Sequence, residues 1–218
     1  MCIRDRKQAI LDLTNDLLEH EFERQGDKAT LKIEMVGIDS RYQTDTVRAA
    51  YQDAPHKSRL QVCMGYGYGA KKKPQRLKKV PKNTGEAKGF GWYLGPAKSG
   101  IQTLELDTNR LKSFVHTRYA TALGDPGSWS LFKADPEEHA LNASHICAEY
   151  RTTLTGPWGE VDEWDVKPGR PDNDWFDCDV GCAGIASLRG ITMIGTEERD
   201  NGRKARKKID GKLWGKKR

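Results

Sequence analysis

Two aspartates far apart in the chain, Asp39 and Asp177, are the strongest candidates for chemistry in this sequence. Asp39 ends an apolar run over residues 31–39 and precedes polar residues, so we expect it where a buried strand leaves its sheet. Asp177 lies near the start of a segment rich in small residues that we expect to be a helix. Two carboxylates that meet at a sheet edge suit a metal-dependent site that cleaves phosphodiester bonds, because each divalent ion takes several oxygen ligands.

Each carboxylate also has an ordinary structural explanation. Asp39 could form a turn or cap a helix, and Asp177 could be an exposed helix residue. Asp172, Asn173 and Asp174, just before Asp177, could cap the same helix and complement its dipole. Taken one at a time, these residue types leave both explanations open.

Other candidates are weaker. Glu149, within residues 145–151, and Asp107, directly after residues 104–106, are the next acidic candidates. Lys112 and His116 lie four residues apart on one expected helix and could contact phosphates, although an ordinary surface position is the simpler explanation.

Two basic segments account for the charge of the chain, which is +6 overall. Residues 71–82 carry seven basic side chains and no acid, and residues 203–218 carry nine against one aspartate. Such segments favour a polyanion, most simply nucleic acid, and the alternative is a solvated loop and a disordered tail. The candidate DNA-binding residues of the first segment are Lys71, Lys72, Lys73, Arg76, Lys78 and Lys79.

The elements that must position these residues alternate between helix and strand. Apolar spacing predicts helices over residues 7–24, 46–52, 108–122, 135–151 and 172–189, and strands over residues 29–39, 59–64, 101–106 and 128–133. A Gly- and Lys-rich excursion over residues 65–100 has room for a hairpin, and residues 155–168 predict another. This alternation predicts an α/β sandwich.

The bulk composition bounds the class of protein. A length of 218 residues fits one α/β domain with appendages, which buries roughly 70% of its unfolded surface without needing a staple. No apolar stretch is long enough to span a bilayer and no signal peptide is present, which predicts a soluble chain. The sequence has no GxxxxGK[ST] motif, which excludes an ATPase motor within this chain.

The cysteines predict a reducing compartment. Cys2, Cys63, Cys147, Cys178 and Cys182 are odd in number and lack paired CxxC spacing. Cys178 and Cys182 are four residues apart on the last expected helix, and we expect them to pack as small hydrophobic groups.

Several segments, taken in order, carry a family resemblance. They are residues 37–47 (GIDSRYQTDTV), 109–115 (NRLKSFV), 129–132 (WSLF), 145–149 (HICAE), 161–164 (VDEW) and 171–178 (PDNDWFDC). Together they resemble the C-terminal nuclease half of phage terminase large subunits of the GpA, lambda-like class. The likeness spans residues 7–195, and its most specific parts are the segment around Asp39 and the segment that ends at Cys178.

The resemblance implies an RNase H-like mixed sheet flanked by helices and an endonuclease that cuts concatemeric viral DNA during packaging. In that family an Asp on the first strand, an acid after a later strand and an Asp on the last helix hold two Mg²⁺ or Mn²⁺ ions. Asp39 matches the second acid and Asp177 the third, while Glu149 is a less secure ligand. Relatives often have His where this chain has Asp174, which adds negative charge beside the site.

The resemblance also implies how the chain is divided and what it meets. Residues 7–195 would be the nuclease domain without its first strand, preceded by a truncated or non-native start (1–6) and followed by a basic tail (196–218). The upstream ATPase would be absent, and with two of three acids we expect weak metal binding and low or absent cutting. Expected partners are double-stranded DNA, the terminase small subunit and the portal or procapsid, in the cytoplasm of the infected bacterial host, with no membrane.

Two other functions compete with this one. A non-enzymatic DNA-binding or capsid-assembly module would use the acids as caps and the basic tail for binding. A junction resolvase or integrase on the same fold would explain the acids, but not the segment 171–178 with its upstream hairpin.

Overall fold

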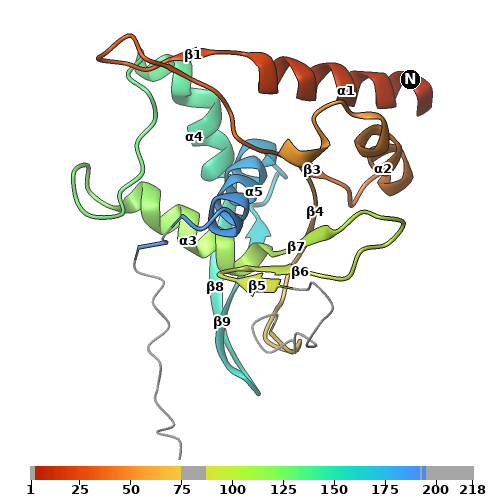
Figure 1. Cartoon of the computed structure of the whole chain (residues 1–218). Coiled ribbons are helices and arrows are strands. Elements are labelled where there is room, and N and C mark those ends of the chain that lie inside the picture. The colour runs from red at the N-terminus through yellow and green to blue at the C-terminus, as the bar shows by residue number, and fades with distance from the viewer. Residues whose placement is uncertain (1–2, 75–86, 192, 195–218) are drawn as a thin grey trace, which may run out of the picture.

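The centre of the fold is a mixed sheet of five strands in the order β3-β4-β7-β6-β5 (Figure 1). The computed structural model describes residues 3–74, 87–191 and 193–194. Strands β3 (Val36–Asp39), β4 (Leu60–Tyr66) and β7 (Thr103–Asp107) run parallel. Strands β6 (Trp92–Leu94) and β5 (Ala87–Gly89) complete the sheet in antiparallel pairing.

Alternation along β4 separates two cores, because successive side chains of a strand point to opposite faces. Leu60 packs with Leu18 in one cluster of buried residues, and Val62 lies in a second cluster on the same side of the sheet. Cys63 belongs to the largest cluster, on the opposite face, together with Leu104. A helical layer therefore covers each face.

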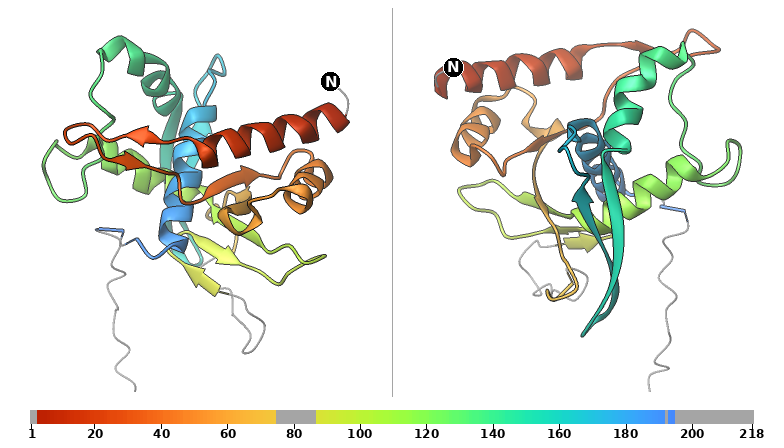
Figure 2. Two further views of the ribbon diagram at one scale, coloured as in Figure 1. Left: turned by 45° about the horizontal axis from the view of Figure 1, so that its top comes forward. Right: turned by 180° about the vertical axis from the view of Figure 1, so that it is seen from behind.

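Helices α1 (Ile3–Glu19) and α2 (Thr44–Asp53) cover one face and pack against each other (Figure 2). Their buried residues, among them Leu18 and Val47, meet the apolar side chains of β3 and β4. A short 3-10 turn, η1 (Lys57–Arg59), leads from α2 into β4. A two-stranded ribbon, β1 (Phe22–Glu23) with β2 (Thr30–Leu31), connects α1 to β3.

Helices α3 (Thr108–Ala120) and α5 (Asp174–Leu188) pack together on the other face. Small residues allow α5 to approach the sheet closely, since a Cβ at Gly37 would overlap Ile185 and a Cβ at Gly184 would overlap Leu106. Helix α4 (Ala140–Ile146), preceded by the 3-10 turn η3 (Pro136–His139), packs against α5.

A long hairpin completes the structure. Strands β8 (Glu149–Gly156) and β9 (Gly159–Val166) pair along their whole length and project from the body below α3 (Figure 1). Most hairpin side chains are exposed or half-buried, so contacts with α3 and with the loop after β4 hold it in place.

The predicted fold class is confirmed: the sheet is an RNase H-like mixed sheet with helices on both faces. The strands at β4 and β7, helix α3 and the hairpin of β5 and β6 also lie where they were predicted, whereas the hairpin expected over residues 155–168 already begins at Glu149. The expected disordered tail lies outside the described residues. No helix within the described ranges is long and apolar enough to cross a membrane.

Several predicted boundaries are wrong for local reasons. The first helix runs from Ile3 to Glu19, whereas it was expected over residues 7–24. It therefore includes residues 3–6, which were expected to precede it. The domain boundary at residue 7 stays a prediction. The expected strand over residues 29–39 is two short strands with a bend at Glu34 between them. The helix expected over 135–151 ends at Ile146, because β8 begins at Glu149.

Residues 128–133 do not form the predicted strand. Trp129 instead closes the end of α3, donating its backbone N–H to the Arg118 carbonyl at 3.1 Å. Its ring packs edge-on against Phe114 and Tyr119, with centroid distances of 5.9 Å to each. The Trp129 side chain, part of the apolar pattern that suggested a strand, therefore packs against helix α3.

The cysteine prediction is also wrong, because Cys178 and Cys182 are exposed on α5 instead of packed as small hydrophobic groups. Their positions face away from the buried stripe of Phe176, Val180 and Ala183. The N-cap of α5 is Asn173, one of the three candidate caps, and the helix begins at Asp174 instead of at the expected residue 172.

Candidate active site

The carboxyl ends of the three parallel strands meet at one edge of the sheet. Asp39 is the last residue of β3, and Asp107 is the last residue of β7. Ligand sites of open α/β sheets form at such edges, because loops and helix starts converge there. Asp107 itself acts as the N-cap of α3, accepting a hydrogen bond from the Arg110 backbone N–H at 3.2 Å.

Asp39 faces the α5 side of the sheet. Gly37, two residues earlier on β3, lies against Ile185 of α5, and residues two apart on a strand share a face. Burial, together with the charge of the Asp39 carboxylate beside it, raises the pKa of the Cys63 thiol to about 12. Partial removal of the Cys178 thiol on α5 from water raises its pKa, although the residue as a whole is exposed, and Asp39 is among the carboxylates that add to the shift.

Asp39 is also the turn-former that its sequence position allowed. Its Oδ1 accepts a hydrogen bond from the Arg41 backbone N–H at 3.1 Å, and the Arg41 guanidinium donates to the Gly65 carbonyl at 3.0 Å. This turn ties the end of β3 to the end of β4. The Asp39 side chain remains exposed, so its second oxygen faces solvent at the sheet edge.

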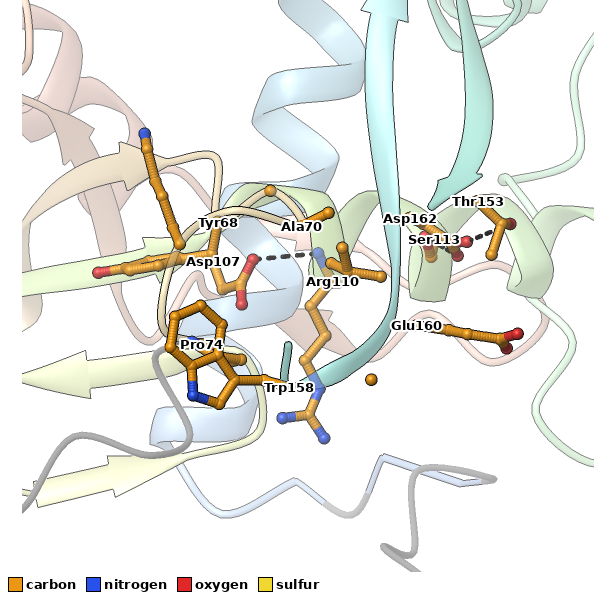
Figure 3. A pocket seen from close by; sticks show the side chains of 14 residues that line it. Tyr68, Ala70, Pro74, Asp107, Arg110, Ser113, Thr153, Trp158, Glu160 and Asp162 are labelled. Carbon is orange, nitrogen blue, oxygen red and sulfur yellow. Dashed lines mark hydrogen bonds between the residues drawn. The ribbon is translucent and has the colours of Figure 1, made fainter. Parts of the chain in front are cut away.

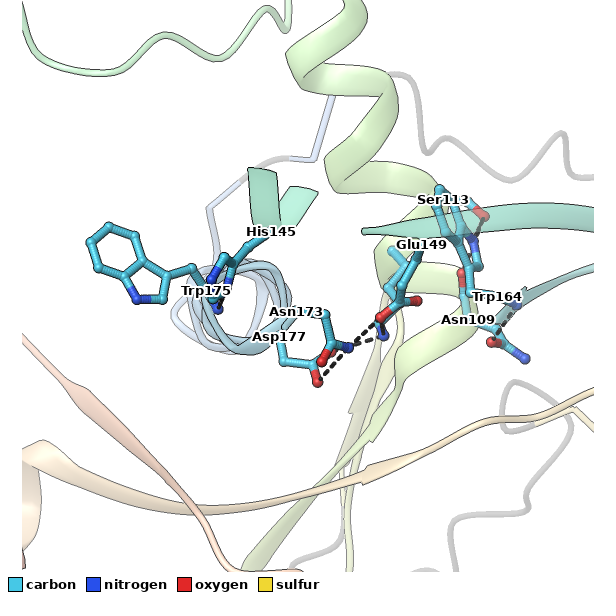
Figure 4. Close-up of polar contacts among 9 residues, drawn as sticks. Asn109, Ser113, His145, Glu149, Trp164, Asn173, Trp175 and Asp177 are labelled. Atoms are coloured by element: carbon cyan, nitrogen blue, oxygen red, sulfur yellow. Dashed lines mark hydrogen bonds and ion pairs between the residues drawn. The ribbon is translucent and has the colours of Figure 1, made fainter. Parts of the chain in front are cut away.

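A second group of charges gathers where α3, β8 and α5 meet. The Lys112 ammonium of α3 donates to Glu149 Oε1 at the start of β8 and lies 2.9 Å from Asp177 Oδ1 on α5. Asn173 donates its Nδ2 to the same Glu149 oxygen and lies 3.4 Å from Asp177 Oδ2. Figure 4 shows Glu149, Asn173 and Asp177 pointing toward one another. We call Lys112, Glu149, Asn173 and Asp177 the Lys112 cluster.

Burial differs sharply within the Lys112 cluster. The side chains of Lys112 and Glu149 are 10% and 2% exposed, whereas that of Asp177 is 51% exposed. Glu149 Oε2 is buried and has no hydrogen-bond partner among the described residues. A buried carboxylate oxygen without a donor is costly, so this oxygen has an unused capacity to bind a cation.

The donor types suit a hard divalent ion, since carboxylate oxygens are the ligands that Mg²⁺ and Mn²⁺ prefer. Among the residues that the structure describes, however, no three His, Cys, Asp or Glu side chains are arranged to hold a metal ion. The cation between Glu149 and Asp177 is the Lys112 ammonium. The side-chain oxygens of this cluster are therefore suitable ligands for a divalent metal ion, but Lys112 lies between Glu149 and Asp177.

Neighbouring contacts fix the helices that carry this cluster. Tyr119 of α3 donates its hydroxyl to Asp179 Oδ2 of α5 at 3.0 Å, and Asn142 of α4 lies 3.5 Å from the same oxygen. The Trp175 backbone N–H donates to His145 Nδ1 at 3.2 Å, which ties the first turn of α5 to α4. These contacts hold Asp177 in its position toward α3.

The hairpin is joined to α3 by a polar network. Asp162 of β9 accepts from the hydroxyls of Ser113 and Thr153, both at 2.7 Å. The Trp164 indole donates to Ser113 Oγ at 2.9 Å, and its backbone N–H donates to Asn109 Oδ1 at 3.3 Å (Figure 4). Because β8 begins at Glu149, this network also positions the buried carboxylate.

A pocket of about 340 Å³ lies between the loop after β4, the start of α3 and the hairpin. Figure 3 shows Arg110 and Trp158 on one side of it and Thr153 and Asp162 on the other. Lys72 also lines this pocket, which therefore combines basic and aromatic groups with acids. The Arg110 guanidinium lies 4.4 Å from the centroid of the Phe90 ring.

The basic loop after β4 rests on the hairpin. The Ala70 backbone N–H donates to Glu163 Oε1 at 2.7 Å, and the Lys72 N–H donates to the Gly69 carbonyl at 2.9 Å. Lys71, Lys72 and Lys73 are exposed, as a role in DNA binding requires. The other predicted DNA contacts, Arg76, Lys78 and Lys79, and the 203–218 tail lie outside the described residues.

Two features of this site were not foreseen from the sequence. Lys112 was predicted to contact phosphate, but its ammonium is buried against two carboxylates and is not presented to solvent. Asn173 was considered only as a possible helix cap, although it contacts both acids of the cluster. The available signal was its position four residues before Asp177, which places both side chains on one side of the helix start.

Comparison with known proteins gives one match. The family model described as terminase large subunit gpA, endonuclease domain, matches residues 4–199. No curated protein and no solved structure matches the chain. The matched range contains Asp39 and every residue of the Lys112 cluster, and it confirms the resemblance that the motifs indicated.

Proposed function

The chain belongs to the family of terminase large subunit gpA endonuclease domains, and we propose that its acidic site hydrolyses phosphodiester bonds of double-stranded DNA with divalent metal ions. The observation that carries this proposal is the meeting of Glu149 and Asp177 on one cation beside the sheet. Asp39 adds a third carboxylate on the same side, since it lies on the face of β3 that α5 covers.

Each acid has a distinct part in this proposal. Asp39 and Asp177 are the principal metal ligands, because both side chains are exposed and come from different elements. Glu149 is the supporting ligand, with a buried oxygen held in place by β8. When bound, Mg²⁺ or Mn²⁺ supplies Lewis acidity for attack on phosphorus and neutralises charge on the departing 3′ oxygen.

The basic loop would hold the DNA. It follows β4, whose carboxyl end lies at the same sheet edge as Asp39. Lys71, Lys72 and Lys73 are exposed on it, and Arg110 lines the adjoining pocket. Contacts from these side chains to phosphate would orient the duplex without reading its sequence.

The biological setting proposed here follows the family. The substrate would be concatemeric viral DNA, cut during packaging in the cytoplasm of the infected bacterial host. The terminase small subunit and the portal would be the protein partners.

A nicking assay with the two principal ligands tests the proposal. Supercoiled plasmid DNA is incubated with the chain and Mn²⁺, and the nicked and linear products are quantified. We expect slow but measurable Mn²⁺-dependent cutting that Asp39→Asn and Asp177→Asn each lower further, by at least about 100-fold, because each removes a ligand charge.

The control is Asp172→Asn, which makes the same charge change at an exposed position just before α5. It should retain cutting, and circular dichroism should show all three variants folded. Cutting that survives in either ligand variant, or the absence of any Mn²⁺-dependent cutting by the wild-type chain, would contradict the proposal.

A further inference from the structure

We propose that Lys112 is a built-in counter-cation, which joins Glu149 to Asp177 in the metal-free protein and which a divalent ion displaces from between them. This inference rests on the proposed function, since it concerns the same acids. It assigns to Lys112 a role that neither a surface phosphate contact nor a purely structural ion pair would have.

The first support is the geometry. One ammonium contacts carboxylates from two different elements, Glu149 at the start of β8 and Asp177 on α5. Its position between two oxygen donors is the position that a bridging cation takes. Because two cations repel at this distance, Lys112 and a divalent ion cannot both lie between the acids.

The second support is the burial of the lysine. Lys112 is 8% exposed, and lysines this buried are almost always paired with acceptors. Its ammonium also lies 5.5 Å from the centroid of the Phe176 ring, which is fully buried. A lysine stem has four flexible carbons, so the ammonium can leave this position without unfolding α3.

The third support is the unused oxygen. Glu149 Oε2 is buried with no partner among the described residues, although Oε1 of the same carboxylate receives both Lys112 and Asn173. Lys112 therefore leaves one oxygen of the Glu149 carboxylate without a donor among the described residues. A divalent ion can accept more oxygen ligands than one ammonium can serve with its three donors.

The half-exposed Asp177 provides the route for exchange. Its side chain is 51% exposed, so a hydrated ion can reach the cluster from solvent while Glu149 stays buried. The displaced ammonium would then be free to meet a phosphate oxygen of the substrate. The predicted phosphate contact of Lys112 would thus belong to the metal-bound state.

Mn²⁺ affinity in the absence of DNA tests the competition. Free Mn²⁺ is followed by its electron paramagnetic resonance signal during titration into the full chain, as wild type and as Lys112→Gln. Because the variant removes a competing charge, we expect its Kd for Mn²⁺ to fall by about tenfold. An unchanged or weaker affinity would overturn the inference.

The matched control is Lys7→Gln. It removes the same charge and also breaks a lysine–aspartate ion pair, but that pair joins α1 to α2 on the opposite face of the sheet. We expect this variant to bind Mn²⁺ like the wild type. An equal fall of the Kd for Mn²⁺ in both variants would mean that only the net charge of the protein matters, and it would also overturn the inference.

A second measurement uses only the wild-type chain, so it does not depend on a variant that folds. Lysines are acetylated briefly with and without saturating Mn²⁺, and each modified site is quantified by mass spectrometry. Lys112 should react about fivefold faster with Mn²⁺, because reactivity requires exposure of its ammonium. Lys7 should react at the same rate with and without Mn²⁺. An unchanged rate at Lys112 would contradict its displacement by the metal ion.

The two proposals can fail separately. If Asp177→Asn abolishes Mn²⁺ binding and cutting while Lys112→Gln leaves affinity unchanged, the counter-cation fails and the nuclease stands. If Lys112→Gln tightens Mn²⁺ binding but no DNA is cut, the nuclease fails and the counter-cation stands. If no form of the chain binds Mn²⁺, both proposals are wrong.

Discussion

Two lysine–carboxylate ion pairs on opposite faces of the sheet show how burial changes what a charge can do. Lys7 of α1 pairs with Asp53 of α2, and their side chains are 32% and 55% exposed. Lys112 of α3 pairs with Glu149, and their side chains are 10% and 2% exposed. The residue types are nearly the same, but the first pair is exposed to solvent and the second is buried.

The comparison teaches why one pair is a site and the other is only a surface contact. Water can replace either member of the exposed pair at little cost, so little depends on that partnership. Around Glu149 water is excluded, and the carboxylate needs a cation or a donor at all times. A buried charge of this kind can exchange its cation for another cation, but it cannot do without one.

The largest expected effect is the loss of the buried cation. Lys112→Met leaves Glu149 buried and uncompensated, and removing one partner of a buried pair costs about 3–5 kcal/mol. Urea denaturation of wild type and variant measures this difference in the free energy of unfolding. Lys7→Met, in which the exposed carboxylate stays hydrated, should be close to the wild type.

The same comparison can be sharpened with a second substitution at the buried pair. Lys112→Met combined with Glu149→Gln removes both charges, so the double variant should recover most of the lost stability. A double variant as unstable as Lys112→Met would place the loss in packing against Phe176 instead of in the unpaired carboxylate.

The sequence predicted those parts of the structure whose signals are local. The spacing of Leu111, Phe114 and Val115 fixes α3, and apolar residues fix β4 and β7, because each pattern matches the period of its element. Strand β8 was not predicted over most of its length, since its side chains after Glu149 are exposed on both faces and leave no alternation to read.

The site was predictable only in part for a related reason. Asp39 and Asp177 were found through their segments, which carry a family pattern that a single sequence can display. The meeting of Lys112 with Glu149 joins residues 37 positions apart, and it depends on how α3 and β8 pack. No helix or strand period encodes such a contact, so the burial of Lys112 came only from the structure.

The smallest expected effect is the pH dependence of the exposed pair. A hydrogen bond and the charge of Lys7 lower the pKa of Asp53 below its usual value of 3.8. The folded state therefore binds fewer protons than the unfolded state near this pH, and the contribution of Asp53 to stability is present above pH 3.8 and is lost as the pH falls through the lowered pKa. Urea unfolding of wild type and Asp53→Asn between pH 2.5 and about 6 measures this contribution to the free energy of unfolding, and the two curves should converge at the acidic end.

The control is Asp12→Asn, which changes an exposed aspartate on α1 that accepts a hydrogen bond from neutral Gln8. This variant should follow the wild type more closely. If Asp53→Asn instead matched wild type at every pH, the ion pair with Lys7 would contribute nothing beyond the hydration of its two groups, and only the buried pair of the Lys112 cluster would affect stability.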